Sequence, residues 1–269
     1  MSHRGAFFWG GVLVLVGILI FLNNLGWLAV DVWKILVPGM VILVGLITVW
    51  AATRPRRGLA DQPLQVALDS SARASVRVRF GAGRLRIGGG AGAGAVVEGS
   101  FRGGIEHDVR RSGPELQVDL RVPPDFFLNF ITPWAWWSGE RLEWDARLTE
   151  AVPLSLDVKT GASEARLDLS RLKLEKMRLS SGASSVEITM PAAAGRTEAR
   201  IESGAASLGV VIPAGVGARI EVESGLADAR VDPARFQKTG KVYQSADYET
   251  AANRLDLRVE AGVASIDIR

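Results

Sequence analysis

Two hydrophobic patterns divide the chain. Residues 6–22 and 35–52 are nearly uninterrupted apolar runs, whereas apolar and polar residues alternate from about residue 64 onward. A run of about 17–25 apolar residues is long enough for a membrane-spanning helix, and alternation with a period of two is typical of strands with one buried face. The pattern therefore predicts two transmembrane helices followed by an all-β domain.

The two apolar runs predict a transmembrane helical hairpin over residues 1–57. A short, partly polar turn separates them, and tryptophans lie near their ends, where indole rings favour the headgroup zone of a bilayer. A cleaved signal peptide is the alternative for the first run. No small-residue cleavage site follows that run, and a second apolar run comes soon after it, so the sequence favours the hairpin.

Charge is distributed unevenly along the chain. The first 57 residues contain five of the 32 basic and one of the 29 acidic residues, which leaves 27 basic and 28 acidic residues for the remainder. A nearly neutral β domain without a basic stripe argues against binding to nucleic acid. Arg4 and the cluster Arg54, Arg56 and Arg57 flank the hairpin on one side. The positive-inside rule therefore predicts a multi-pass protein of the plasma membrane with a cytoplasmic C-terminal domain.

A unit of about 21 residues repeats within the β domain. Its first glycines lie 21, 22 and 21 residues apart, and the last follows after 37 residues, which leaves room for an insertion around residues 236–250. The repeat-turn glycines are Gly161, Gly182, Gly204, Gly225 and Gly262, with an early outlying copy at Gly81. Alternation on both sides of each glycine predicts two half-buried strand arms, joined at a bend or at a backbone conformation with positive φ.

One such unit cannot bury its own apolar face, so we expect the units to stack, each arm pairing with the same arm of the next unit. Residues 172–179 alternate apolar and charged side chains, which predicts a strand rather than a helix. The expected architecture is a two-helix hairpin (1–57), a linker (58–63) and a β-solenoid or rack-like domain (64–269) that is less regular over residues 88–144. Open ends of the stack would support end-to-end association of copies.

An insertion over about residues 123–137 interrupts the β pattern and is rich in aromatic residues and proline. Its candidate partner or membrane contact residues are Phe126, Phe127, Phe130, Trp134, Trp136 and Trp137. Two interpretations remain open. The segment is either a plug that covers an open end of the stack or an exposed apolar loop that touches the bilayer or a partner.

The sequence offers little for catalysis. With no cysteine and two histidines, thiol chemistry and zinc clusters are excluded or nearly so. His107 and Asp108 are adjacent, so on a strand they point to opposite faces and form no dyad. The glycine-rich residues 88–95 lead into a further strand instead of a helix, which favours a hairpin turn over a dinucleotide site. We expect no catalytic residue, cofactor or metal site.

Charged residues of the β domain are expected to lie on solvated strand faces. Glu143 and Asp145 would share one strand face, for which solvation is a better explanation than a glycosidase pair. The outward positions Arg166, Glu187 and Arg230 of successive units predict a cross-strand charge ladder rather than a binding surface.

Two segments resemble a known family. The N-terminal pattern of Trp9-Gly10, Gly17, Asn23-Asn24, Trp33-Lys34 and Pro38 resembles the transmembrane region shared by LiaI/LiaF-like proteins. The repeats, above all GASEARLDLSRLKLEKMRLSSGASSVEITMP at 161–191, resemble the toast-rack β domain of LiaF-like cell-envelope stress proteins. The resemblance implies a bacterial protein whose cytoplasmic rack modulates a sensor histidine kinase.

The expected function is thus that of a non-enzymatic bacterial membrane protein, which modulates an envelope-stress response by protein contact. Its expected partners are the lipid bilayer and a sensor histidine kinase or another membrane protein. The alternative is an extracytoplasmic structural or adhesive β module that binds envelope polymers. The side of the membrane on which the β domain lies discriminates between the two hypotheses.

Overall fold

The computed structural model describes residues 38–39, 42, 45, 61–124, 141–225 and 228–269. The chain divides into two compact units, Met1–Arg57 and Gly58–Arg269. In the first unit the described residues are helical. No helix in the described part of the chain is both long and apolar enough to cross a membrane. Nearly all of the two expected spans lies outside the described residues, so the hairpin stays a prediction.

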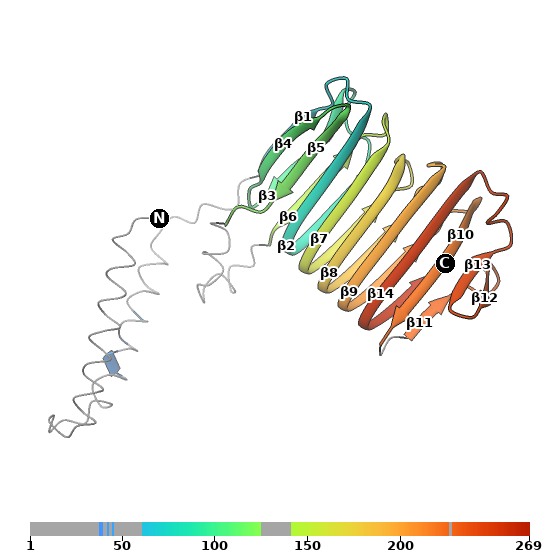
Figure 1. Ribbon diagram of the computed structural model, residues 1–269. Coiled ribbons are helices and arrows are strands. Elements are labelled where there is room, and N and C mark those ends of the chain that lie inside the picture. Colours follow the sequence, from blue (N-terminus) through green and yellow to red (C-terminus); the bar gives the residue numbers. More distant parts are fainter. Residues whose placement is uncertain (1–37, 40–41, 43–44, 46–60, 125–140, 226–227) are drawn as a thin grey trace. The chain divides into compact units, whose positions relative to one another are not determined.

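The second unit is built from strands (Figure 1). They are β1 (Asp61–Ala67), β2 (Arg73–Gly89), β3 (Ala95–Arg102), β4 (Glu106–Ser112), β5 (Glu115–Arg121), β6 (Glu143–Leu148), β7 (Leu154–Asp168), β8 (Leu174–Thr189), β9 (Arg196–Val211), β10 (Val216–Ser224), β11 (Asp228–Val231), β12 (Phe236–Thr239), β13 (Val242–Ser245) and β14 (Asn253–Ile268). The predicted strand at 172–179 is confirmed from Leu174 onward, where β8 begins. The first strand begins at Asp61, so residues 61–63 belong to this strand and not to the predicted linker.

Five long strands form the centre of the domain and lie side by side in parallel, in the order β2, β7, β8, β9 and β14 (Figure 1). Each has two arms, here called the first arm before the repeat glycine and the second arm after it. The division is clear in β2. Along the edge opposite β7, the first arm of β2 pairs with β5 and its second arm pairs with β6. The expected pairing of like arms in successive units is confirmed from β7 to β9.

The order of the last two units differs from the expected one. The C-terminal strand β14 lies between β9 and the pair formed by β10 and β11. In the stack, the last unit of the sequence therefore follows β9 directly, and the unit that precedes it in the sequence comes after it. The expected insertion is confirmed as the hairpin of β12 and β13, which pairs with the outer edge of β10. The C-terminus of the chain therefore belongs to an interior strand.

The core lies between the two arms. Alternate side chains of β7 are buried on both sides of the glycine, with Leu154, Leu156 and Val158 in the first arm and Ala165 and Leu167 in the second. All five belong to one contiguous apolar cluster that contains residues from the whole stack. Burial of one such aliphatic side chain contributes roughly 1.5–3 kcal/mol, so the stacked rows are the main source of stability.

The edges of the sheet are protected against further pairing. The outermost strand β4 has an exposed, charged sequence, β1 contains Pro63, and β11 and β12 have four residues each. Charge, proline and short length are common ways in which edge strands avoid association.

Candidate functional site

The candidate aromatic contact residues at 126–137 lie outside the described residues, but both ends of their segment are described. The chain leaves β5 at Arg121 and returns at β6, which starts at Glu143. The carbonyl oxygen of Leu142, just before β6, accepts a hydrogen bond from the backbone N–H of Arg84 in β2 (2.8 Å). The returning end of the segment is thus fixed against the second arm of β2.

The first strand of the domain starts two strands from this returning end, with β3 between β1 and β6. Asp61 lies opposite Arg102 of β3, which in turn lies opposite Glu143 of β6. The Arg102 guanidinium pairs with the carboxylates of both neighbours, at 3.3 Å from Asp61 and 3.7 Å from Glu143. Arg102 therefore joins the start of the β domain to the end of the aromatic segment.

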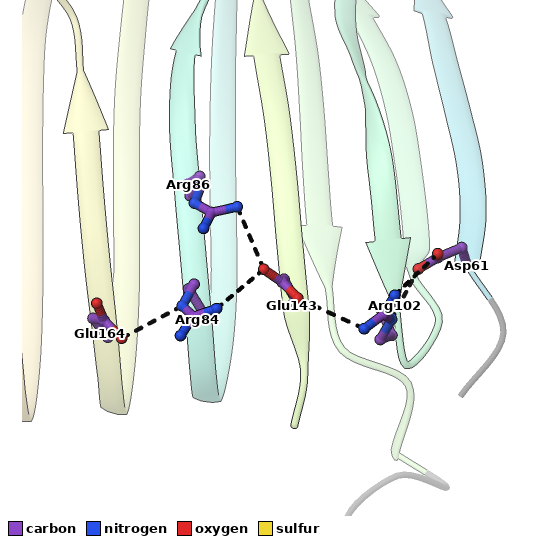
Figure 2. A network of polar contacts seen from close by, with 6 residues as sticks. All are labelled: Asp61, Arg84, Arg86, Arg102, Glu143 and Glu164. Atoms are coloured by element: carbon purple, nitrogen blue, oxygen red, sulfur yellow. Dashed lines mark hydrogen bonds and ion pairs between the residues drawn. The ribbon is translucent and has the colours of Figure 1, made fainter. Parts of the chain in front are cut away.

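Glu143 is the centre of a larger ionic network on the outer face of the second arms. Figure 2 shows its members, which are Asp61, Arg84, Arg86, Arg102, Glu143 and Glu164. The Glu143 carboxylate accepts hydrogen bonds from Arg84 and Arg86 (both 3.4 Å), and Arg84 also pairs with Glu164 (3.4 Å). The hydrogen bonds to Glu143 and Glu164 raise the pKa of Arg84 above its ordinary value. Each of these solvent-screened pairs contributes little to stability by itself, but together they connect side chains of five neighbouring strands.

The core under this network is aromatic. Trp144, the residue after Glu143, is fully buried, and its ring lies 5.3 Å from that of Phe80 and 5.2 Å from that of Phe101. Its indole nitrogen has no hydrogen-bond partner within the described ranges. The strand alternation of β6 therefore places an apolar anchor inside and the network outside.

The predicted charge ladder is present in part. Arg166 of β7 and Glu187 of β8 face each other and form an ion pair of 2.8 Å. The next outward position along the stack is Gly209, where the alternation of charges stops. Opposite charges meet again at the far end of the stack, where Arg230 of β11 lies opposite Asp267 of β14.

The repeat-turn glycines form a row across the stack, in the spatial order Gly81, Gly161, Gly182, Gly204, Gly262 and Gly225. A Cβ atom on Gly161 would lie 2.6 Å from the carbonyl oxygen of Gly81, and one on Gly182 would lie 3.1 Å from that of Gly161. None of these glycines has a positive φ, so that part of the prediction is wrong. Glycine is needed here because the backbones of neighbouring strands approach closely at the bend.

The remaining sequence candidates are not part of a reactive site. His107 and Asp108 are exposed on β4, and Asp108 pairs with Arg110 (2.7 Å). The glycine-rich segment connects β2 to β3 without a helix, as expected. The predicted hairpin is wrong, however, because β6 lies between β2 and β3. The described residues contain no group of three or more potential metal ligands.

Comparison with known proteins decides the family. Residues 58–211, more than half of the chain, match a family model described as the N-terminal domain of toast_rack, DUF2154. The chain belongs to the toast-rack family. No curated protein matches it. The rack is also similar to a crystal structure of a "putative cell adhesion protein" from Clostridium sporogenes ATCC 15579, with a TM-score of 0.70 and 21% identity over 78% of this chain and 98% of that one. At this identity the likeness establishes the fold alone.

The outer faces of the toast-rack domain are grooved. One groove of about 770 Å³ crosses the strands beside the glycine row, and another of about 510 Å³ lies over the first arms of β7, β8 and β9. A third, of about 330 Å³, lies beside the Glu143 network. The sequence alone did not predict that network. Two signals were nevertheless visible, an acid shortly after the aromatic insertion (Glu143) and two arginines at alternate positions of one strand (Arg84 and Arg86).

Proposed function

We propose that this protein is a non-enzymatic bacterial membrane protein that modulates an envelope-stress response by protein contact through its toast-rack domain. The observation that carries the proposal is the pair of broad outer faces, on which charged side chains from strands distant in sequence stand in register. A parallel sheet with ion-paired rows keeps such side chains in fixed positions, which favours recognition of another protein's surface.

The resemblance to LiaF-like proteins supports a sensor histidine kinase as the partner, and the apolar runs at 6–22 and 35–52 support a membrane tether. Arg102 adds a structural argument, because it pairs both with Asp61, at the entry to the domain, and with Glu143, after the aromatic segment. The entry to the domain and the return from the aromatic segment are thus joined by one side chain, and aromatic residues of the kind found in that segment favour lipid headgroups or a membrane partner.

The first test is the side of the membrane on which residue 269 lies. C-terminal fusions to one reporter that is active only in the cytoplasm and one active only outside should give cytoplasmic activity. Crosslinking in native membranes should then recover a sensor kinase with the full-length chain. Reporter activity outside the cytoplasm would overturn kinase contact by this domain.

Adhesion is the second candidate function, and one observation favours it. The similar crystal structure is described as that of a "putative cell adhesion protein". In this case the rack would lie outside the cytoplasmic membrane and bind envelope polymers. Retention of the full-length protein on isolated cell-wall material, together with an external C-terminus, would support adhesion over kinase regulation.

The aromatic segment provides a further test of the contact model. Replacement of Trp134, Trp136 and Trp137 by serine should leave the unfolding transition unchanged and weaken binding to the membrane or the kinase. Loss of the folded domain in this variant would instead identify the segment as a cap on the core.

A further inference from the structure

One long strand differs from its neighbours on the outer face of the first arms. The outward positions two, four and six residues before the repeat glycine carry acid, arginine and acid in β9 and β14. The same positions of β8 are Ser180, Arg178 and Lys176, without an acid. At these three positions β8 therefore has two positive charges, where each of the next two strands has one net negative charge. The acid of this arm, Glu175, lies beside Lys176 and pairs with Arg73 (3.6 Å).

The arginines of β9 and β14 are neutralised by the row of glutamates beside them. Arg200 pairs with Glu202 (2.8 Å) and Glu260 (2.9 Å), and Arg258 pairs with Glu260 (3.0 Å) and Glu223 (3.0 Å). Arginines directly opposite each other on adjacent strands repel one another, and the glutamates offset this repulsion.

Arg178 stands in the same row without this compensation. It lies opposite Arg200 on β9 and opposite Asp157 on β7. One oxygen of the Asp157 carboxylate is bound by Arg77 (3.3 Å), and the other accepts no hydrogen bond from Arg178. Lys159 of β7 lies opposite Ser180 and adds a third cation. The side chains of Lys159, Lys176 and Arg178 are exposed and, within the part of the chain that the structure describes, form no ion pair or hydrogen bond.

These three cations and the Ser180 hydroxyl, together called the basic patch, also line hollows in the surface. Lys176 and Arg178 border the groove of about 510 Å³ over the first arms. Lys159 and Ser180 border the groove of about 770 Å³ beside the glycine row. The patch is thus open to a ligand along its whole length.

We propose that the basic patch binds an extended acidic segment of a partner protein, which lies along β8. The proposal deepens the proposed function, on which it rests, by naming the chemistry of the contacted partner. Alternate side chains of an extended segment are about 6.6 Å apart, the same spacing as that of Lys176 and Arg178 along their own strand. Acidic side chains at alternate positions can therefore pair with both cations.

The surroundings of the patch favour a narrow ligand over a membrane surface. Glu198 and Glu202 lie on β9, one strand spacing from Lys176 and Ser180. A broad anionic surface would meet these carboxylates and be repelled, because strands are about 4.8 Å apart. One extended chain is narrow enough to contact β8 without covering β9.

Binding of a designed probe peptide tests the proposal. The full-length chain in nanodiscs of zwitterionic lipid is titrated into a fluorescent peptide of alternating glutamate and serine, and anisotropy is measured at low and high salt. We expect binding that weakens with salt, and a loss of roughly tenfold in affinity for Arg178→Glu, because an unpaired cation becomes a repelling charge. Arg166→Glu, the same charge reversal at a paired site on the other face, should leave the affinity within about twofold.

Three outcomes would overturn the proposal: no binding of the peptide to the wild-type chain, an equal loss for Arg166→Glu, or patch-dependent binding to phosphatidylglycerol vesicles but not to the peptide. These outcomes are separable from failure of the proposed function. The protein could bind the peptide, lose that binding only in Arg178→Glu, and crosslink to no kinase. This result would support the basic patch and contradict the proposed kinase partner.

Discussion

At the scale of the residue, the clearest constraint is the close approach of backbones at the glycine row. A Cβ on Gly161 would lie 2.6 Å from the carbonyl oxygen of Gly81, closer than a methyl group can approach without a shift of the backbone. Gly209 of β9 is a contrast, because a Cβ there meets no atom within 4 Å. The two glycines therefore have different physical reasons to be present.

This contrast predicts opposite effects of alanine. Gly161→Ala should lower the free energy of unfolding by about 1–3 kcal/mol, as overpacking does in other proteins. Gly209→Ala should raise it by about 0.4–1 kcal/mol, because alanine restricts the unfolded chain. Urea unfolding of the two variants measures both effects, and equal stability of the two would contradict a steric role for the glycine row.

Tyr248 gives the domain a predicted sensitivity to alkaline pH. Burial and a hydrogen bond from its hydroxyl to Asp256 raise the pKa of Tyr248 above its ordinary value of 10.0. The folded state therefore holds the phenolic proton more tightly than the unfolded state. Stability from this group is fully present below pH 10 and is lost as the pH rises from about 10 toward the higher pKa of the folded state.

Tyr248→Phe removes this titration. We expect the free energy of unfolding to fall less steeply above pH 10 in the variant than in the wild type, while both curves run parallel between pH 8 and 9. Urea unfolding at closely spaced pH values provides the comparison. Identical slopes above pH 10 would show that Tyr248 does not titrate differently in the two states.

At the scale of the element, the decisive feature is the interior position of the C-terminal strand. Along most of its length β14 pairs with β9 on one side and with β10 or β11 on the other. Its removal would therefore leave β9 and β10 without their shared partner and open the core between them.

Truncation before Asn253 tests this arrangement. The shortened chain should lose its cooperative unfolding transition, as measured by circular dichroism, and become sensitive to protease. Replacement of the edge hairpin Phe236–Ser245 by a short flexible linker is the control, and we expect it to lower stability but keep a cooperative transition. A truncated chain that stays folded would place β14 at the edge of the sheet.

At the scale of the whole molecule, the toast-rack domain is a one-dimensional stack with a protected centre and weaker ends. The strands β7, β8, β9 and β14 have paired neighbours on both sides, whereas β4 and β12 pair on one side only. In stacked repeats each unit is stabilised by its neighbours, so local opening is easiest at the ends.

Hydrogen exchange should reveal this gradient. Amides of β8, β9 and β14 should exchange slowest, and those of β4 and β12 should exchange faster by orders of magnitude, because end strands open without the rest of the stack. Exchange followed by mass spectrometry on the intact protein is the measurement. Amides of β14 that exchange as fast as those of β4 would contradict the observed strand order.

The sequence by itself determined which side chains face the core and where each strand bends. Alternation around Gly182 and Gly204 predicted the two arms, and the charged pattern of residues 172–179 predicted strand instead of helix. These features are local, because the period of two and the absence of a side chain at glycine act on the few residues beside them.

Only the tertiary structure decided which strands are neighbours. Alternation predicts the face of the sheet on which a side chain lies, but it does not predict which strand is next to it. The position of β14 between β9 and β10 could therefore not be predicted from the repeat. For the same reason, the Glu143 network and the basic patch could not be predicted from the sequence. Whether Arg178 is paired depends on the carboxylates of adjacent strands, and those strands are brought together by the apolar rows of the core.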